Sequence, residues 1–180
     1  MSMSENTVVI RDAELTDRDA TREVLLDAYG QYEKVLDEEA WGRYKESILS
    51  AIDGAATKAR LVAVLNGEVV GSVFLFDSSD AAYGLPDLNI QSPIIRLLAV
   101  SQNARGYGVA TALIRESAKL ALEWGAETLH LHTSDMMDSA VRLYERLGFD
   151  RATDKDLMNG ETLVKSYRLT LKETSLLQAQ

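Results

Sequence analysis

A strand, a glycine turn and a helix follow one another in the middle of this chain. Residues 93–100 are almost unbroken apolar sequence, which is typical of a central strand covered on both faces. Gly106 and Gly108 follow, and apolar residues then recur at helical spacing as far as Trp124. Glycines in such a turn can present successive N–H groups beside a helix N-terminus, which suits a phosphate. They equally suit an ordinary strand-to-helix turn, so both interpretations stay open here.

Two common nucleotide-binding patterns fit this turn poorly. A dinucleotide fingerprint needs a third glycine where the chain has Thr111. It also needs an acidic residue at a strand end about 20 positions further on, and the nearest candidate is Asp135. A Walker loop would end in Gly-Lys-Ser/Thr, which does not occur here. Neither pattern therefore explains the turn.

The order of the expected strands and helices along the chain predicts a mixed α/β fold. Two amphipathic helices are expected between residues 19 and 54, and Asn66-Gly67 is typical of a tight hairpin turn. Strands are expected at 8–10, 61–65, 69–76, 128–133 and 163–171, a helix at 138–147, and a polar connection at 77–91. Because no repeat or linker divides the sequence, one domain is predicted over residues 1–180, with a core at about 8–171.

Charge and composition exclude several classes of function. The net charge of −9 disfavours electrostatic binding to the phosphates of nucleic acid or to an anionic membrane surface. The absence of cysteine excludes disulfides and thiol chemistry, and two histidines make a dedicated metal site a poor expectation. Without an apolar run of about 18 residues or a leader pattern at the N-terminus, the expected location is the cytoplasm.

Two segments share their order and spacing with a known enzyme family. The first is the strand at 95–100 followed by Arg105-Gly106-Tyr107-Gly108-Val109-Ala110, and the second is Ala140-Val141-Arg142-Leu143-Tyr144-Glu145-Arg146-Leu147-Gly148-Phe149. They resemble the Arg/Gln-x-x-Gly-x-Gly/Ala acyl-CoA motif and the Ala-x-x-x-Tyr-x-x-x-Gly-Phe motif of the GNAT superfamily of N-acetyltransferases. The resemblance extends over about residues 8–171.

This resemblance implies a GNAT-like single-domain fold and an acetyl-CoA site. The fold would be a twisted mixed sheet of about seven strands, with a splay between two parallel strands, flanked by about four helices. Pantetheine would lie in the splay and pair with a bulged strand, and the pyrophosphate would lie on the turn. The cofactor-binding residues implied are Leu98, Ala99, Val100, Arg105, Gly106, Tyr107, Gly108, Val109, Ala110 and Thr111. No metal is implied.

The resemblance also implies a direct transfer of the acetyl group to an amine. Tyr144 matches the tyrosine that protonates the departing thiolate, although its helical spacing also suits a core tyrosine. Residues 93–100 lack the carboxylate that often acts as the base in this family. The remaining candidates are Asp77, Asp87, Asp135 and His132, and Met137 replaces a common asparagine.

The expected acceptor is a primary amine of a small molecule or a protein. The first two helices shape this site in the family, and residues 12–53 carry a net charge of −7, which would attract a cation. Tyr29, Tyr32, Trp41 and Tyr44 are candidates to line it, although a solvated, partly core-packed helix pair explains these features as well. A homodimer is a further expectation, with residues 163–171 as an edge strand. The alternative function is a non-catalytic acyl-CoA sensor or partner-binding module.

Overall fold

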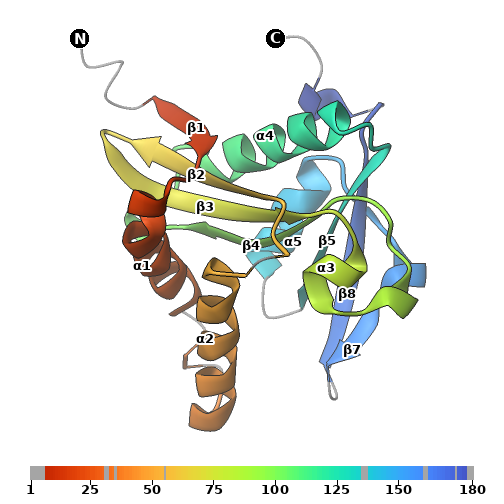
Figure 1. Cartoon of the computed structure of the whole chain (residues 1–180), viewed down its shortest axis with the longest axis horizontal. Coiled ribbons are helices and arrows are strands. Elements are labelled where there is room, and N and C mark those ends of the chain that lie inside the picture. The colour runs from red at the N-terminus through yellow and green to blue at the C-terminus, as the bar shows by residue number, and fades with distance from the viewer. Residues whose placement is uncertain are drawn as a thin grey trace. The chain divides into compact units, whose positions relative to one another are not determined.

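The computed structural model describes residues 7–30, 33–34, 36–54, 56–134, 138–159, 162–172 and 174–177. In these ranges the chain has eight strands and five α-helices (Figure 1), against about seven and four expected. The mixed α/β class is confirmed. The chain divides into two compact units, residues 1–74 with 97–114 and residues 75–96 with 115–180, and the single domain stays a prediction.

The first unit is built on four strands that are hydrogen-bonded in chain order. They are β1 (Val8–Asp12), β2 (Ala59–Leu65), β3 (Glu68–Phe76) and β4 (Ile94–Val100), of which the first unit includes the second half. β1 runs antiparallel to β2, with Val8 opposite Leu65. The turn between β2 and β3 is the predicted hairpin, because Asn66 and Gly67 adopt φ angles of 54° and 80°.

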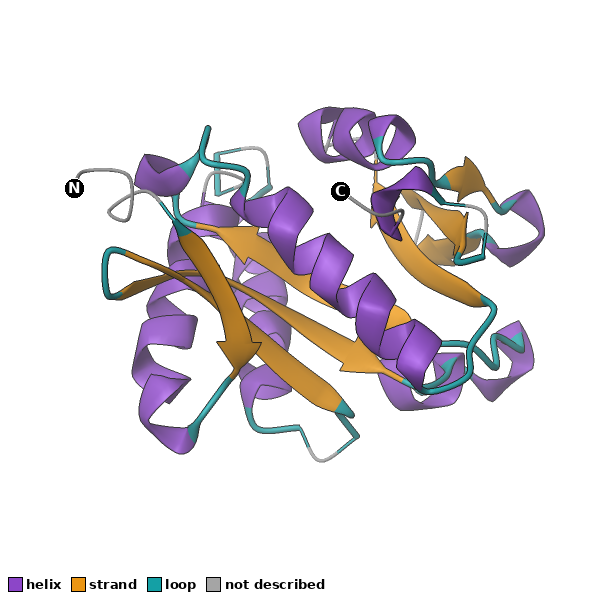
Figure 2. Ribbon diagram, turned by 90° about the horizontal axis from the view of Figure 1, so that it is seen from above, coloured by secondary structure: helices purple, strands orange, loops and turns teal. Residues whose placement is uncertain are grey.

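Helices cover both faces of these strands (Figure 2). α1 (Arg18–Tyr29) and α2 (Glu38–Ile52) lie on one face, and the first turns of α4 (Val109–Glu123) lie on the other. The predicted apolar stripes face inward, since Leu25 and Ile48 are buried. The N-terminus of α2 is capped by the Asp37 side chain, which accepts a hydrogen bond from the backbone N–H of Ala40.

Gly71 on β3 allows α4 to pack closely against the strands. A Cβ at this position would lie 2.8 Å from Cγ1 of Val109 and 3.1 Å from both the Ala99 carbonyl oxygen and Cδ1 of Leu113. Gly71→Ala is therefore expected to lower the free energy of unfolding by about 1–3 kcal/mol, the usual cost of overpacking a core. Urea unfolding would measure this change.

Gly42 provides the matched control for that substitution. It lies within α2, and a Cβ there would meet no atom within 4 Å. Gly42→Ala should raise stability by roughly 0.5–1 kcal/mol, because alanine has the higher helix propensity. If both variants were equally stable or both gained stability, close packing at Gly71 would not be the reason for its glycine.

The second unit surrounds the strand β8 (Thr162–Thr170). Its strands are hydrogen-bonded in the order β4-β5-β8-β6, with β5 at Thr128–Ser134 and β6 at Asp150–Arg151, and β7 (Leu157–Asn159) also pairs with β8. β4 and β5 are parallel, as expected, with Ile94 opposite His130. The helices of this unit are α3 (Ser79–Tyr83), the later turns of α4, and α5 (Asp138–Arg146).

Two expectations about the second unit were wrong. β8 is not an edge strand, because it pairs with β5 along one side and with β6 and β7 along the other. The polar connection at 77–91 is not a plain loop, since it contains α3 and the 3-10 turn η4 (Pro86–Leu88). Further 3-10 turns occupy Leu15–Asp17, Gln102–Ala104, Thr153–Lys155 and Ser175–Leu177. None of the helices in the described ranges is both long and apolar enough to cross a bilayer.

Candidate active site

β4 changes its backbone conformation abruptly in the middle. Leu97 adopts a φ of 56°, in the left-handed region that non-glycine residues rarely occupy. Such a residue inside a strand is typical of a β-bulge and costs about 1–3 kcal/mol, and it occurs most often at functional sites. Leu98, Ala99 and Val100, the predicted pantetheine-binding residues, follow directly. The carbonyl oxygen of Leu98 accepts a hydrogen bond from the hydroxyl of Tyr29 at 3.0 Å.

The glycine turn is exposed between β4 and α4. Gly106 and Gly108 adopt φ angles of 93° and 75°, so both occupy conformations that glycine adopts without strain. Residues 105–108 are exposed, whereas Val109 is buried and anchors the start of α4. The first N–H groups of a helix have no acceptor within the helix, and α4 has 15 residues. The turn can therefore present backbone donors to an anion.

The segment after Tyr144 forms a recognisable helix end. The N–H of Phe149 donates to the carbonyl of Tyr144 at 3.0 Å, and the N–H of Gly148 donates to that of Glu145 at 3.1 Å. These two bonds define a Schellman motif, which requires a left-handed residue where Gly148 has a φ of 100°. The motif thus explains why Gly and Phe end α5.

Tyr144 lies in a buried aromatic cluster. Only 7% of the residue is exposed, and its ring centroid lies 5.9 Å from that of Phe149 and 6.5 Å from that of Tyr167. The packing agrees with the core interpretation of this tyrosine. Its role as a proton donor stays a prediction.

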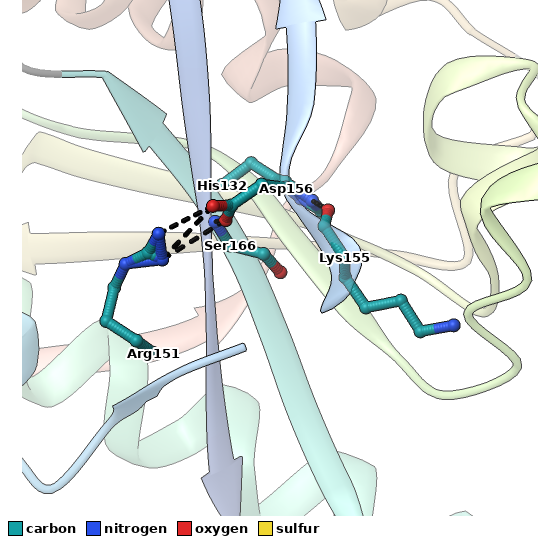
Figure 3. Close-up of polar contacts among 5 residues, drawn as sticks. All are labelled: His132, Arg151, Lys155, Asp156 and Ser166. Carbon is teal, nitrogen blue, oxygen red and sulfur yellow. Dashed lines mark hydrogen bonds and ion pairs between the residues drawn. The ribbon is translucent and has the colours of Figure 1, made fainter. Parts of the chain in front are cut away.

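His132 on β5 is hydrogen-bonded at both ring nitrogens. Nε2 lies 3.0 Å from the carbonyl oxygen of Lys155 (Figure 3). Nδ1 lies 3.0 Å from the hydroxyl oxygen of Tyr83. A carbonyl oxygen only accepts, so in neutral His132 the proton is on Nε2, and Nδ1 accepts from Tyr83. Burial lowers the pKa of His132, partly offset by its bond to the Lys155 carbonyl and by the charge of Asp156.

Two residues after β6, Lys155 and Asp156, connect this part of the sheet to neighbouring segments. Asp156 forms a salt bridge with Arg151 at 2.6 Å and accepts a hydrogen bond from the N–H of Ser166 at 2.7 Å (Figure 3). The Lys155 ammonium donates to the carbonyl oxygens of Leu88 and Asn89 at 3.1 and 3.3 Å. The connection at 77–91 is thus fastened to the strands by side chains that sequence reasoning missed; its unusual length was the only signal.

His130 shares the strand with His132 but has different partners. Its Nε2 lies 3.1 Å from the hydroxyl oxygen of Thr128, which in turn donates to Ser92 at 3.0 Å. Burial, together with the charge of Arg168, lowers the pKa of His130 to about 4. His130 is therefore neutral near pH 7.

The other candidate bases are less well placed. Asp77 and Asp87 are exposed, one after β3 and the other in η4. Asp135 and Met137 lie outside the described residues, as does Tyr32 of the predicted aromatic group. Within the described ranges, no three His, Asp or Glu side chains gather as metal ligands would.

The other aromatic residues of the first two helices pack on one another. The ring of Tyr44 lies 5.9 Å from that of Tyr29 and 6.1 Å from that of Trp41, in edge-on contacts. A separate cavity of about 420 Å³ lies near the start of α1, with Thr21, Arg60 and Phe74 in its lining. It contains none of the predicted site residues.

Comparison with known proteins identifies one family. Residues 19–149 match the model of the acetyltransferase (GNAT) family. N-acetyltransferase 8B of Homo sapiens is 31% identical over 124 residues, covering 64% of this chain and 52% of the relative. N-acetylaspartate synthetase of Xenopus tropicalis is 38% identical over 88 residues, covering 49% and 29%. The chain therefore spans about half or less of the length of these relatives.

Solved structures share the fold. The PaiA N-acetyltransferase of Thermoplasma acidophilum, solved in complex with coenzyme A, aligns with a TM-score of 0.66 at 16% identity. The alignment covers 89% of this chain and 98% of that one. At this identity the likeness concerns the fold alone.

Proposed function

The chain belongs to the GNAT acetyltransferase family, and from this premise we propose that it transfers an acetyl group from acetyl-CoA to a primary amine. The observation that carries the proposal is the exposed turn at 105–108, with Gly106 and Gly108 in left-handed conformations directly before α4. Such a turn suits a pyrophosphate. The bulge at Leu97 suits the pantetheine arm of the same cofactor, which would pair with the strand after it.

The proposed cofactor contacts are those implied by the motifs. The backbone of Leu98 and Val100 would pair with pantetheine, with Ala99 between them in the same strand. The pyrophosphate would accept hydrogen bonds from the backbone of Arg105, Gly106, Tyr107, Gly108, Val109 and Ala110, and from Thr111 at the start of the helix. That the Thermoplasma acidophilum relative was solved with coenzyme A supports this assignment.

The proposed reaction is a direct attack. The neutral amine nitrogen forms a bond to the thioester carbonyl carbon, and the carbon–sulfur bond then breaks. A backbone N–H near Leu98 to Val100 would stabilise the charge that develops on the carbonyl oxygen. The departing thiolate takes a proton from the hydroxyl of Tyr144, whose usual pKa of about 10 is close to that of an alkyl thiol. The attacking nitrogen loses one proton to water as the amide forms, and a proton from water restores the Tyr144 hydroxyl.

The proposed acceptor is a cationic amine. Residues 12–53, which include α1 and α2, carry a net charge of −7, and such a surface concentrates cations near it. The name of N-acetylaspartate synthetase refers to a particular product, whereas that of N-acetyltransferase 8B refers to none, so the chemical class is as far as this proposal extends.

Two measurements test the proposal on one sample. Calorimetry with acetyl-CoA should show binding, and thiol release should then depend on adding a polyamine, an aminoglycoside, an amino acid or a basic peptide. Binding without release for every amine would favour a non-catalytic acyl-CoA sensor. No binding would contradict the proposal altogether.

A further inference from the structure

We propose that the cavity near the start of α1 binds a small organic acid, with the carboxylate on Arg60 and the hydrocarbon part against the apolar lining. This site goes beyond the proposed function, because its lining contains none of the residues assigned to the cofactor or to the transfer step. Every residue of the lining belongs to the first compact unit, so the site is complete within that unit.

The cavity has the size and the lining of a small-molecule site. Its volume of about 420 Å³ lies within the usual range of roughly 300–1,000 Å³ for ligand pockets. Ile52, Leu61, Val62 and Phe74 supply the apolar part of the lining, and each of them is at most 8% exposed. A hydrocarbon group that binds against these side chains leaves water for an apolar surface, which is favourable.

Other residues of the lining are exposed, so the cavity is open to solvent. Leu15 is 94% exposed, and the side chains of Arg18 and Asp53 are 51% and 59% exposed. A small molecule can therefore enter without a rearrangement of the helices.

Three contacts hold the guanidinium of Arg60 in place. Nε donates a hydrogen bond to the carbonyl oxygen of Ile52 at 3.2 Å, and Nη2 donates to that of Gly54 at 2.6 Å. The Cζ atom lies 5.7 Å from the centroid of the Phe74 ring, in a cation–π contact. Because the side chain is already ordered, it loses little conformational freedom when a ligand binds.

One nitrogen of Arg60 remains available to a ligand. Within the described ranges, Nη1 makes no hydrogen bond and the guanidinium forms no salt bridge. Nη1 is also not among the buried polar atoms that lack a partner there, so this nitrogen is accessible. Asp53 is a nearby carboxylate, but both of its oxygens already accept hydrogen bonds from Arg18. These bonds lower the pKa of Asp53, and the charge of Arg60 lowers it further.

The charges of the lining favour a carboxylate over a phosphate. Arg18 and Asp53 neutralise each other, which leaves Arg60 as a cation and Glu14 as an exposed anion. A carboxylate carries one negative charge, which the guanidinium matches with charge-assisted hydrogen bonds. A phosphate monoester carries a charge of about −1.5 to −2, and Glu14 would repel the excess. The ligand class is therefore a small acid with one carboxylate.

Titration with sodium phenylacetate and with sodium hexanoate, without acetyl-CoA, tests the site. We expect saturable shifts in the backbone NMR signals of Thr21 and Leu61, with a dissociation constant of about 1 mM for a ligand of about ten non-hydrogen atoms. Phenylacetamide has the same shape and no charge, so it should bind at least about tenfold more weakly. Inorganic phosphate should also bind more weakly than phenylacetate.

Arg60→Gln tests the carboxylate contact. Glutamine keeps N–H donors for the carbonyls of Ile52 and Gly54 and removes the charge. The affinity for phenylacetate should fall at least about tenfold, and that for phenylacetamide should change little. Arg43→Gln is the matched control, since it removes an exposed arginine of α2 that pairs with Glu39 outside the cavity. Its affinity for phenylacetate should equal that of the wild type.

Ala13→Leu tests the apolar part of the site without any change of charge. Ala13 lines the cavity, and its backbone N–H donates to the carbonyl oxygen of Arg60 at 2.9 Å, a bond that leucine keeps. The larger side chain should occupy space in the cavity, so phenylacetate and phenylacetamide should both bind more weakly. Thermal unfolding of each variant would show whether the fold is retained.

The outcomes separate this inference from the proposed function. Absence of saturable binding of both acids up to about 20 mM would overturn the site, and so would displacement of acetyl-CoA by phenylacetate. Equal affinities of the wild type and Arg60→Gln for phenylacetate, or equal affinities of the wild type for phenylacetate and phosphate, would overturn the assigned ligand class. Failure to bind acetyl-CoA would contradict the proposed function and leave this site standing.

Discussion

Gly108→Asp should abolish measurable acetyl-CoA binding, with a loss of at least about 100-fold, or ~2.8 kcal/mol. The new carboxylate would stand in the turn proposed to hold the pyrophosphate, and like charges brought together cost several kcal/mol. Aspartate is among the residues that tolerate a positive φ best, and a Cβ at Gly108 meets no atom within 4 Å. The fold should therefore survive. Calorimetry with acetyl-CoA measures the effect.

Gly67→Asp is the control for that experiment. Gly67 has a φ of 80°, close to the 75° of Gly108, and it also has open space where a Cβ would be added. The same substitution there introduces the same charge and similar backbone strain in the β2–β3 turn. Its affinity for acetyl-CoA should stay near that of the wild type. Equal losses in the two variants would attribute the effect to strain or net charge, and wild-type affinity in Gly108→Asp would refute the phosphate-binding turn.

Tyr144→Phe should lower kcat by roughly 100-fold or more and leave the affinity for acetyl-CoA within about twofold of the wild type. The phenylalanine keeps the ring packing against Phe149 and Tyr167, so the cofactor-binding surface and the core are both preserved. On the proposed function, the substitution removes the proton for the departing thiolate. Steady-state thiol release and calorimetry give the two quantities separately.

The control for Tyr144 is its neighbour in the same cluster. Tyr167→Phe also removes a hydroxyl from a buried tyrosine, which is 2% exposed. Tyr167→Phe should change the free energy of unfolding and leave kcat close to that of the wild type. Parallel losses of affinity and turnover in Tyr144→Phe would mean that the hydroxyl supports the structure and not the transfer step.

Much of the fold could be predicted because its signals are local. Asn66-Gly67 allowed a hairpin turn that few other dipeptides form, and the structure has positive φ at both residues. The spacing of Leu25 on α1 and Ile48 on α2 predicted which faces are buried. The same local chemistry identified the turn at Gly106 and Gly108. Whether that turn holds a pyrophosphate stays a prediction.

What could not be predicted depends on residues far apart in the chain. Mixed polarity suggested an edge for β8, yet the number of neighbouring strands is decided by tertiary pairing, and β8 has partners on both sides. Tyr83 and His132 are separated by 49 positions, and Lys155 and Leu88 by 67. A helix of five residues such as α3 gives almost no periodic signal. The contacts that Tyr83 and Leu88 make from the connection at 77–91 could therefore not be predicted.

The bond between Tyr29 and Leu98 has a consequence for how two substrates would bind. On the proposed function, the Leu98 carbonyl belongs to the strand that pairs with pantetheine, and the Tyr29 hydroxyl at the end of α1 already occupies one of its lone pairs. A cofactor that binds there must then share the Leu98 carbonyl oxygen with the Tyr29 hydroxyl or displace that hydroxyl, and either change affects α1. Thermodynamic linkage makes the effect reciprocal: an acceptor that shifts α1 changes cofactor affinity by the same factor by which the cofactor changes acceptor affinity. The two ligands would therefore bind as a coupled pair, with a cooperativity that Tyr29→Phe should reduce.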